Sequence, residues 1–406
     1  MKKNDAGKRY RIVVNTRARL GQVMTPPPLA NAVVCLMGAQ GGNWLELGSG
    51  SGRLAEAVSI SAAPKSYLGV EVESSMIASS PELPGVNFVQ QDVLAVDKLA
   101  HTLAKTKFDY VIGNPPYGIH GFSAQATQRL QMLCPDLEIH GNWAPIDLYF
   151  VLESLSRLKA SGSAAFIVGA DIPCGTQSLE FRKMLLEKAC EIECYELPQT
   201  AFGNSAEVQA YALIARYGKS RARHISLGRL NEQFQVTALR RVSPAQAAAS
   251  MDLSHHEFAE IDAALRKSSQ GQTMKDMEVS IVRGSRTRAQ FSQLGVAHFH
   301  TSDFPRTGME VSFATTPSSD FQQATVGDIL LPRVGTRCLE HKAVVVSGQA
   351  PYSEAVFRVR TPEEHHERVV RWITSSECSA WRRAAARGAC AKHLTVSTLL
   401  SMPVPH

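Results

Sequence analysis

The tetrapeptide Asn114-Pro115-Pro116-Tyr117 carries residue types that could do chemistry. Proline has no N–H and a fixed φ, so the two prolines would end a preceding strand and stiffen an extended loop. The side-chain oxygen of Asn114 and a backbone carbonyl of this loop could then accept two hydrogen bonds from one planar amino group. An amino nitrogen held in this way exposes its lone pair to an electrophilic methyl group. The ring of Tyr117 offers a face on which a planar base or amide could stack. A plain strand-ending turn would use the same residues.

A second cluster of candidate residues surrounds the glycine-rich run Gly48-Ser49-Gly50-Ser51-Gly52, which Glu46 precedes. Glycine has no Cβ and tolerates positive φ, so such a turn lets the backbone approach a ligand closely. Glu71 ends the next expected strand, where its carboxylate could accept hydrogen bonds from both hydroxyls of a ribose. Asp92 ends the third expected strand and could accept from an adenine amino group. The glycine spacing is not the G-x-G-x-x-G of dinucleotide sites, which favours a mononucleoside cofactor.

The elements that must position these residues follow an alternating pattern. From Asn43 to about Tyr217, short apolar runs alternate with helical-period stretches, which predicts an α/β domain with a mostly parallel sheet. The expected strands are residues 44–47, 67–71, 87–90, 108–112, 164–168 and 208–214. Ligands on open α/β sheets bind at the carboxyl ends of the strands, so this fold would gather the candidate residues at one edge.

The regular alternation stops at the polar and basic segment 218–223, so we expect two domains, residues 1–220 and 221–406. A chain of 406 residues also exceeds what one hydrophobic core usually serves. The second part contains strand-like runs and helical runs without an internal repeat, which predicts a mixed α+β domain. The strand-like runs are 328–332 and 343–346, and the helical runs are 363–375 and 380–387.

The net charge of +6 is unevenly distributed about the expected boundary. Residues 1–220 hold 20 Lys/Arg and 20 Asp/Glu, whereas residues 221–406 hold 23 and 17. A basic C-terminal domain suits a polyanionic partner, although solubility alone would also account for such an excess.

Other features of the composition exclude several classes of protein. No apolar run approaches the roughly 20 residues of a membrane-spanning helix, and no apolar segment follows the first residues, so we expect a cytoplasmic protein without membrane contact. The eight cysteines form no CxxC pair, which argues against a metal site or a disulfide framework.

In their order along the chain, these motifs resemble the gamma class of adenine-N6 DNA methyltransferases, the single-chain enzymes of restriction-modification systems. The resemblance covers roughly residues 19–217. It implies a Rossmann-like S-adenosylmethionine-dependent methyltransferase domain and a C-terminal DNA-recognition domain. The implied reaction moves a methyl group from S-adenosylmethionine to the N6 amino group of an adenine that is flipped out of the duplex.

The resemblance also implies roles for individual residues. Thr25, in the segment 21–27, would contact the cofactor, and Phe202, in the segment 200–205, would stack on the flipped base. In the family an aromatic residue often follows the acidic residue of the third strand, whereas here Val93 follows Asp92 and would pack against the cofactor's adenine. The cofactor site implied is Thr25, Glu46, Gly48, Gly50, Glu71, Asp92 and Val93, and the catalytic set is Asn114, Pro115, Pro116, Tyr117 and Phe202.

The segments 326–333 and 399–405 look like parts of target-recognition domains in restriction-modification proteins. The partners implied are double-stranded DNA and, as a second candidate, a cognate restriction endonuclease, with the chain acting as a monomer. Candidate contacts to phosphates or bases are Arg283, Arg286, Arg288, Arg333 and Arg337, although for any one of them a solvated basic face is the better explanation.

Three alternatives remain open from the sequence. The same tetrapeptide occurs in enzymes that methylate glutamine amides in proteins, although the long segment after the catalytic fold argues against a compact enzyme of that kind. Methylation of an RNA base is equally compatible with a basic domain. A DNA-binding subunit with an inactive methyltransferase fold would have to retain the Asn114 loop without using it.

Overall fold

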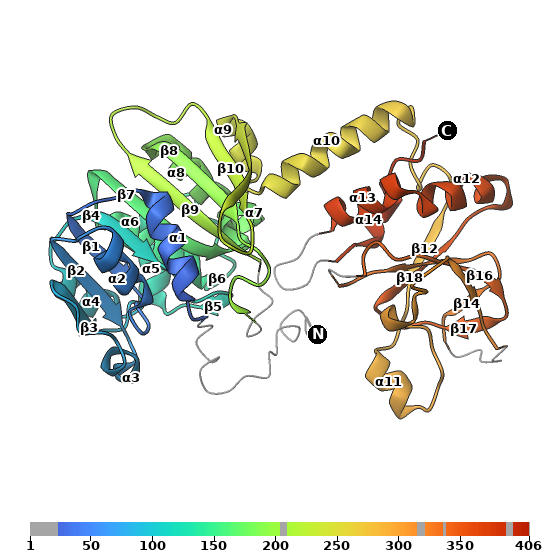
Figure 1. The fold of residues 1–406 in the computed structure, drawn as a ribbon, viewed down its shortest axis with the longest axis horizontal. Helices are drawn as coiled ribbons and strands as arrows, with labels where there is room; N and C mark the ends of the chain where they lie inside the picture. The colour runs from blue at the N-terminus through green and yellow to red at the C-terminus, as the bar shows by residue number, and fades with distance from the viewer. Residues whose placement is uncertain (1–22, 204–208, 315–320, 336–337, 387–392, 406) are drawn as a thin grey trace. The chain divides into compact units, whose positions relative to one another are not determined.

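The computed structural model describes residues 23–203, 209–314, 321–335, 338–386 and 393–405. The chain divides into two compact units, Met1–Leu253 and Ser254–His406 (Figure 1). Each unit has its own sheet and its own buried clusters.

Unit 1 is built on a nine-stranded sheet with the order β11-β10-β8-β9-β7-β4-β1-β2-β3. Only β9 and β11 run against the others, so the sheet is mostly parallel. The strands are β1 (Asn43–Leu47), β2 (Ser66–Glu71), β3 (Val86–Gln90), β4 (Phe108–Gly113), β7 (Leu158–Gly169), β8 (Ala189–Glu196), β9 (Ala210–Tyr217), β10 (Ile225–Leu230) and β11 (Val236–Val242). The predicted α/β fold with a mostly parallel sheet is confirmed.

Helices cover both faces of this sheet because side chains alternate along each strand. Trp44, Ile112 and Ile167 point to the face covered by α1 (Pro27–Met37) and α2 (Arg53–Ser61). Their neighbours along the strands point to the other face, where most of the remaining helices pack. The other helices of unit 1 are α3 (Ser74–Ala78), α4 (Val96–Leu103), α5 (Ala124–Leu133), α6 (Ile146–Ser156), α7 (Asp171–Cys174), the 3-10 turn Thr176–Ser178, α8 (Leu179–Lys188) and α9 (Pro244–Ala249).

The order of the strands reverses at β1. From β1 the chain adds β2 and then β3 on one side, whereas β4 pairs with β1 on the other side. In open α/β sheets such a switch leaves a crevice at the carboxyl ends of the two central strands. The glycine run follows β1 and the Asn114–Tyr117 loop follows β4, so the fold brings the two candidate motifs to this crevice.

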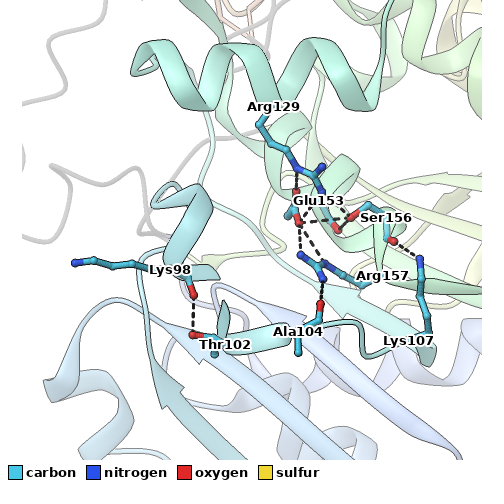
Figure 2. Close-up of polar contacts among 8 residues, drawn as sticks. All are labelled: Lys98, Thr102, Ala104, Lys107, Arg129, Glu153, Ser156 and Arg157. Carbon is cyan, nitrogen blue, oxygen red and sulfur yellow. Dashed lines mark hydrogen bonds and ion pairs between the residues drawn. The ribbon is translucent and has the colours of Figure 1, made fainter. Parts of the chain in front are cut away.

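A network of ion pairs and hydrogen bonds ties α4, α5 and α6 together, as Figure 2 shows. Glu153, on α6, is 2% exposed and accepts from Arg129 Nε of α5 at 2.8 Å and from Arg157 Nη2 at 3.3 Å. Arg157 Nη1 also donates to the carbonyl of Ala104, just after α4, at 2.8 Å. The buried carboxylate thereby joins three helical segments on one face of the sheet.

Unit 2 contains a mixed sheet with the order β12-β18-β15-β16-β13, in which β13 and β16 are parallel and the other pairs antiparallel. Trp372, Trp381 and Leu399 bring three helices onto its core. The strands are β12 (Ser280–Arg283), β13 (Glu310–Ser312), β14 (Gln323–Thr325), β15 (Ile329–Pro332), β16 (Ala343–Ser347), β17 (Gln349–Pro351) and β18 (Val356–Arg360). The helices are α10 (Leu253–Ser268), α11 (Arg288–Gln293), the 3-10 turn Thr301–Asp303, α12 (Glu363–Thr374), α13 (Ser376–Ala385) and α14 (Val396–Leu400). The predicted mixed α+β character of the second part is confirmed.

The division of the chain lies later than the predicted boundary between residues 220 and 221. Strand β10 pairs in parallel with β8, and Ile225 and Leu227 are fully buried in the unit 1 core. Arg182, on α8, donates to the carbonyls of Ala248 and Ala249 at the end of α9. The basic segment that suggested a boundary is therefore a turn between two strands of one sheet.

The described residues contain neither a membrane-spanning helix nor a cluster of metal-ligating side chains. None of the helices placed by the structure is long and apolar enough to cross a bilayer. Within the same residues, no group of three His, Cys, Asp or Glu side chains is arranged to hold a metal ion.

Candidate active site

A pocket of about 200 Å³ lies at the carboxyl ends of β1, β2 and β4 and beside the segment that follows β3. Residues from the segment before α1, from the glycine run and from the Asn114 loop line it together. Nine predicted site residues are in its wall: Thr25, Glu46, Gly48, Gly50, Glu71, Asp92, Val93, Asn114 and Pro116. The structure therefore brings together motifs that are far apart in the sequence.

Glu71 holds the glycine run in place. Its Oε2 accepts from the backbone N–H of Gly50 at 2.7 Å, and its Oε1 accepts from the N–H groups of Val72 at 2.9 Å and Glu73 at 3.0 Å. Gly48 and Gly50 have φ values of 77° and 53°, in the left-handed region that glycine adopts without strain. The carboxylate thus fixes the loop, and Glu71 itself lines the pocket.

Glu46 and Asp92 have different environments. Glu46 is buried and accepts from the hydroxyl of Tyr67, and burial raises the pKa of Glu46 well above its ordinary value. Asp92 is exposed and accepts from the N–H of Leu94 at 2.9 Å, while Val93 beside it is buried. A ligand in the pocket would therefore meet a solvated carboxylate at Asp92 and an apolar surface at Val93.

The amide of Asn114 is oriented by the segment before α1. Its Nδ2 donates to the carbonyl of Val23 at 2.9 Å and to Oγ1 of Thr25 at 2.8 Å. Its Oδ1 accepts from the hydroxyl of Tyr117 at 2.5 Å. Because an amide oxygen has two lone pairs, Oδ1 can accept one further hydrogen bond.

The residues of the Asn114–Tyr117 loop lie in different environments. Pro116 lines the pocket, whereas Pro115 is buried and does not belong to the pocket lining. Tyr117 is partly buried and packs edge-on against Phe202, with ring centroids 6.2 Å apart. Asn114 thus lines the pocket and is also hydrogen-bonded to Tyr117, which packs against Phe202. Phe202 itself is 4% exposed, so its face is covered in this conformation.

A buried acid that we did not predict lies behind Tyr117. Asp147, at the start of α6, is 2% exposed and accepts from the N–H of Gly169 at 3.0 Å. A Cβ added at Gly169 would meet both Asp147 Oδ2 and the Tyr117 ring, so this glycine separates the two side chains. Burial raises the pKa of Asp147 to about 7. Burial also raises the pKa of Tyr117 well above its ordinary value, so its hydroxyl remains a hydrogen-bond donor at neutral pH.

The sequence did not reveal several residues of the pocket wall. Val23, Met76, Ile146 and Phe150 supply apolar surface, and the Phe150 ring lies 3.2 Å from the position of a Cβ at Gly48. Phe150 lies three residues after Asp147 on α6, and this helical spacing could have suggested a common face. Met76 belongs to a short helix without any such pattern.

The lining suits a nucleoside that carries positive charge. Glu71 and Asp92 contribute two carboxylates against the one guanidinium of Arg53, which is also paired with Glu56 at 3.1 Å. The glycine backbone allows close approach, and Val93 and Phe150 provide apolar walls for a planar ring. S-adenosylmethionine has a ribose, an adenine and a sulfonium, so these residues could hold it.

Some predicted residues lie outside this pocket. Positions 21, 22, 204 and 205, in the two segments that the sequence indicated, lie outside the described residues, as does Arg337. In unit 2, Arg283 forms an ion pair with Glu354, and Arg333 Nε donates to the Glu354 carbonyl at 2.7 Å. These two arginines therefore already have partners within the protein.

One family model matches the central part of unit 1. Residues 74–202 match the family model of the Eco57I restriction-modification methylases. The predicted resemblance is confirmed. The matched part, which we call the methylase segment, contains Asp92, the Asn114–Tyr117 loop and Phe202, whereas the glycine run, Glu71 and Thr25 precede it.

One curated relative is the tRNA1(Val) (adenine(37)-N6)-methyltransferase of Shewanella loihica, which is 35% identical over 94 residues. That match covers 21% of this chain and 38% of the relative, so the chain spans less than half of the relative's length.

Two solved structures also resemble the chain. The methyltransferase subunit of a type I restriction-modification system from Streptococcus thermophilus is 24% identical over 51% of this chain and 47% of its own, with a TM-score of 0.42. The type IIG restriction endonuclease BpuSI is 12% identical over 96% of this chain and 59% of its own, with a TM-score of 0.49.

Proposed function

We propose that this protein is a DNA methyltransferase that transfers a methyl group from S-adenosylmethionine to the N6 amino group of a flipped adenine in double-stranded DNA. The observation that carries the proposal is the position of Asn114, which lines the pocket and whose amide oxygen accepts from Tyr117, the residue that packs against Phe202. The match of the methylase segment to restriction-modification methylases supports it.

In this proposal, Glu71 accepts from the ribose of the cofactor, Asp92 from its adenine amino group, and Val93 packs on that adenine. Gly48 and Gly50 let the protein backbone come close to the cofactor. When bound, S-adenosylmethionine supplies an electrophilic methyl group. The pocket's excess of carboxylates favours the sulfonium charge.

Asn114 and the prolines act on the acceptor. The free lone pair of Asn114 Oδ1 and a carbonyl of the Pro115–Pro116 segment accept the two N–H groups of the target amine, which directs its lone pair toward the methyl carbon. As the N–C bond forms and the S–C bond breaks, the amine nitrogen releases one proton to solvent. Tyr117 offers a stacking face, and its hydroxyl keeps Asn114 oriented.

The target base must leave the duplex, because a stacked adenine cannot reach a buried methyl donor. In the proposed role, Phe202 stacks on this base, which requires the covered Phe202 ring to separate from Tyr117. Unit 2 is proposed to recognise the target sequence, and a restriction endonuclease is proposed as a functional partner of the system.

The experiment that tests the proposal compares substrates side by side. Purified full-length protein is incubated with S-adenosylmethionine that carries a labelled methyl group, together with double-stranded DNA, RNA or protein. We expect label in DNA, at N6 of adenine after digestion to nucleosides. Label in protein alone, or at another atom of DNA, would overturn the assignment.

Asn114→Ala should lower methyl transfer by about 10²–10³-fold, the loss typical of removing one preorganised polar contact at a reacting centre. Binding of S-adenosylhomocysteine should change by less than about threefold, because the other lining residues remain. Asn87→Ala, at an exposed position of β3, is the matched control and should transfer at the wild-type rate. Equal methyl-transfer rates for Asn114→Ala and Asn87→Ala would show that Asn114 has no role in the reaction.

A tRNA adenine remains the second candidate substrate, because the curated relative acts on an adenine N6 in tRNA. The chemistry at Asn114 would be the same, and only the macromolecule that delivers the base would differ. The RNA arm of the substrate comparison decides between the two.

A further inference from the structure

The amide of Asn114 has one orientation that its neighbours allow. The carbonyl of Val23 can only accept, so the side-chain atom that faces it at 2.9 Å must be the nitrogen. The second hydrogen of the same nitrogen is taken by Thr25 Oγ1 at 2.8 Å. Both donors of Asn114 are therefore used by the segment before α1, and the oxygen is left for the acceptor substrate.

Thr25 is well placed to make this contact rigid. Its side chain is 8% exposed and precedes three prolines, of which Pro26 has the extended φ and ψ of −66° and 145° that lead into α1. Prolines restrict the backbone before and within the first turn of a helix, so Thr25 has little freedom to move away. The resemblance to known methyltransferases implied only a cofactor contact for this residue.

We propose that Thr25 is a positioning residue for the methyl-transfer reaction and acts through Asn114. This inference rests on the proposed function of Asn114. If the amide rotated by half a turn, its NH2 would face the NH2 of the target base, and two donors would meet where a donor and an acceptor are needed. The Tyr117 hydroxyl holds Oδ1, and the Thr25 hydroxyl and the Val23 carbonyl hold Nδ2, so all three oppose this rotation. Of the two groups that hold Nδ2, only the Thr25 hydroxyl can be removed by substitution.

The test compares Thr25→Val with Thr25→Ser. Valine keeps the shape of threonine without the hydroxyl, whereas serine keeps the hydroxyl. At saturating S-adenosylmethionine, we expect Thr25→Val to lower kcat by about 10- to 100-fold, and Thr25→Ser to restore it to within about threefold of wild type. The Kd of S-adenosylhomocysteine, measured by calorimetry, should change by less than about threefold in both variants. A weaker Kd in Thr25→Val with unchanged kcat would make Thr25 a cofactor contact only and overturn the inference.

Thr102→Val is the matched control. Thr102 Oγ1 donates to the Lys98 carbonyl within α4 at 3.0 Å, outside the pocket wall (Figure 2). This variant should keep the wild-type kcat and Kd. A loss of kcat in Thr102→Val equal to that in Thr25→Val would show that any lost threonine hydroxyl slows the enzyme, and would overturn the inference.

A double-mutant cycle on stability separates this inference from the proposed function. The unfolding temperatures of Thr25→Val, Asn114→Ala and the double variant should be non-additive by about 2 °C, because the two side chains share one hydrogen bond. Additive shifts would overturn the inference even in an active enzyme. A wild-type protein that methylates no substrate would overturn the proposed function, while the cycle would still decide whether Thr25 holds Asn114.

Discussion

The amide of Asn114 has three neighbours of different chemistry: a carbonyl that can only accept, a threonine hydroxyl and a tyrosine hydroxyl. The sequence singled out Asn114 and its prolines as candidates, because that tetrapeptide limits the local backbone. It did not predict which way the amide would face. Asn114 and Thr25 are 89 residues apart, and only the packing of α1 against the sheet brings them together.

The burial of the Asp147 carboxyl could also not be predicted from the sequence. An acidic residue at the start of a helix normally indicates a solvated N-terminus. Here α6 is buried along most of its length, and the carboxyl is enclosed with it. Burial of a carboxyl disfavours its charged form, which is why its pKa rises to about 7.

This raised pKa predicts a pH-dependent stability. The folded-state pKa of Asp147, about 7, lies above its ordinary value of 3.8, so between these values the folded state binds more protons than the unfolded state. The contribution of Asp147 to the free energy of unfolding must therefore fall as the pH rises through this window. We expect the difference between wild type and Asp147→Asn, measured by urea unfolding, to be more favourable to wild type at about pH 5 than at about pH 8, by a few kcal/mol at most. A difference that is independent of pH would contradict this prediction.

At the scale of elements, the expected strands that are rich in apolar residues are all present in unit 1. Strand β8 was not predicted, because its inward-facing residues alternate with Glu191 and Glu193. Arg216, on the neighbouring β9, forms ion pairs with both glutamates at 3.2 and 3.1 Å. Because Arg216 neutralises both glutamates, β8 can lie inside the sheet in spite of its charged residues. The sequence of β8 alone does not show that such a partner exists on another strand.

The helical layer depends on the carboxylate of Glu153. Glu153→Ala leaves Arg129 and Arg157, which are 24% and 12% exposed, without their shared counter-ion. Breaking a buried ion pair from one side is strongly destabilising, so we expect a loss of about 3 kcal/mol in the free energy of unfolding, measured with denaturant. The control Glu180→Ala removes an exposed pair with Lys183 and should cost less than about 1 kcal/mol. Similar losses in the two variants would show that the network in Figure 2 contributes no more than a surface pair.

At the scale of the whole molecule, the corrected division changes the electrostatic argument. Residues 1–253 hold 25 Lys/Arg and 22 Asp/Glu, and residues 254–406 hold 18 and 15, so each unit carries an excess of three positive charges. The uneven charge that favoured a basic C-terminal domain came from Arg221, Arg223, Arg229, Arg240 and Arg241, which belong to unit 1. Net charge therefore does not single out unit 2 as the part that contacts nucleic acid.

The position of the division can be tested with two shortened chains. A chain that ends at Leu253 keeps β10, β11 and α9, so we expect cooperative unfolding and binding of S-adenosylhomocysteine. A chain that ends at Ser220 loses the buried side chains of Ile225, Leu227 and Val242, among others. At about 1.5–3 kcal/mol for each large apolar side chain, this loss approaches the whole stability of a domain, so the shorter chain should aggregate or fail to fold. Thermal unfolding and light scattering measure both outcomes, and a shorter chain as stable as the longer one would support the boundary near residue 220.

The three N–H bonds to Glu71 come from the protein's own backbone, from the segments that follow β1 and β2. The glycine run is consequently ordered when the chain folds, and a nucleoside that enters the pocket need not immobilise it. Association should then proceed without a slow loop-closing phase. Stopped-flow binding of a fluorescent nucleoside analogue would show a single phase whose rate rises linearly with analogue concentration.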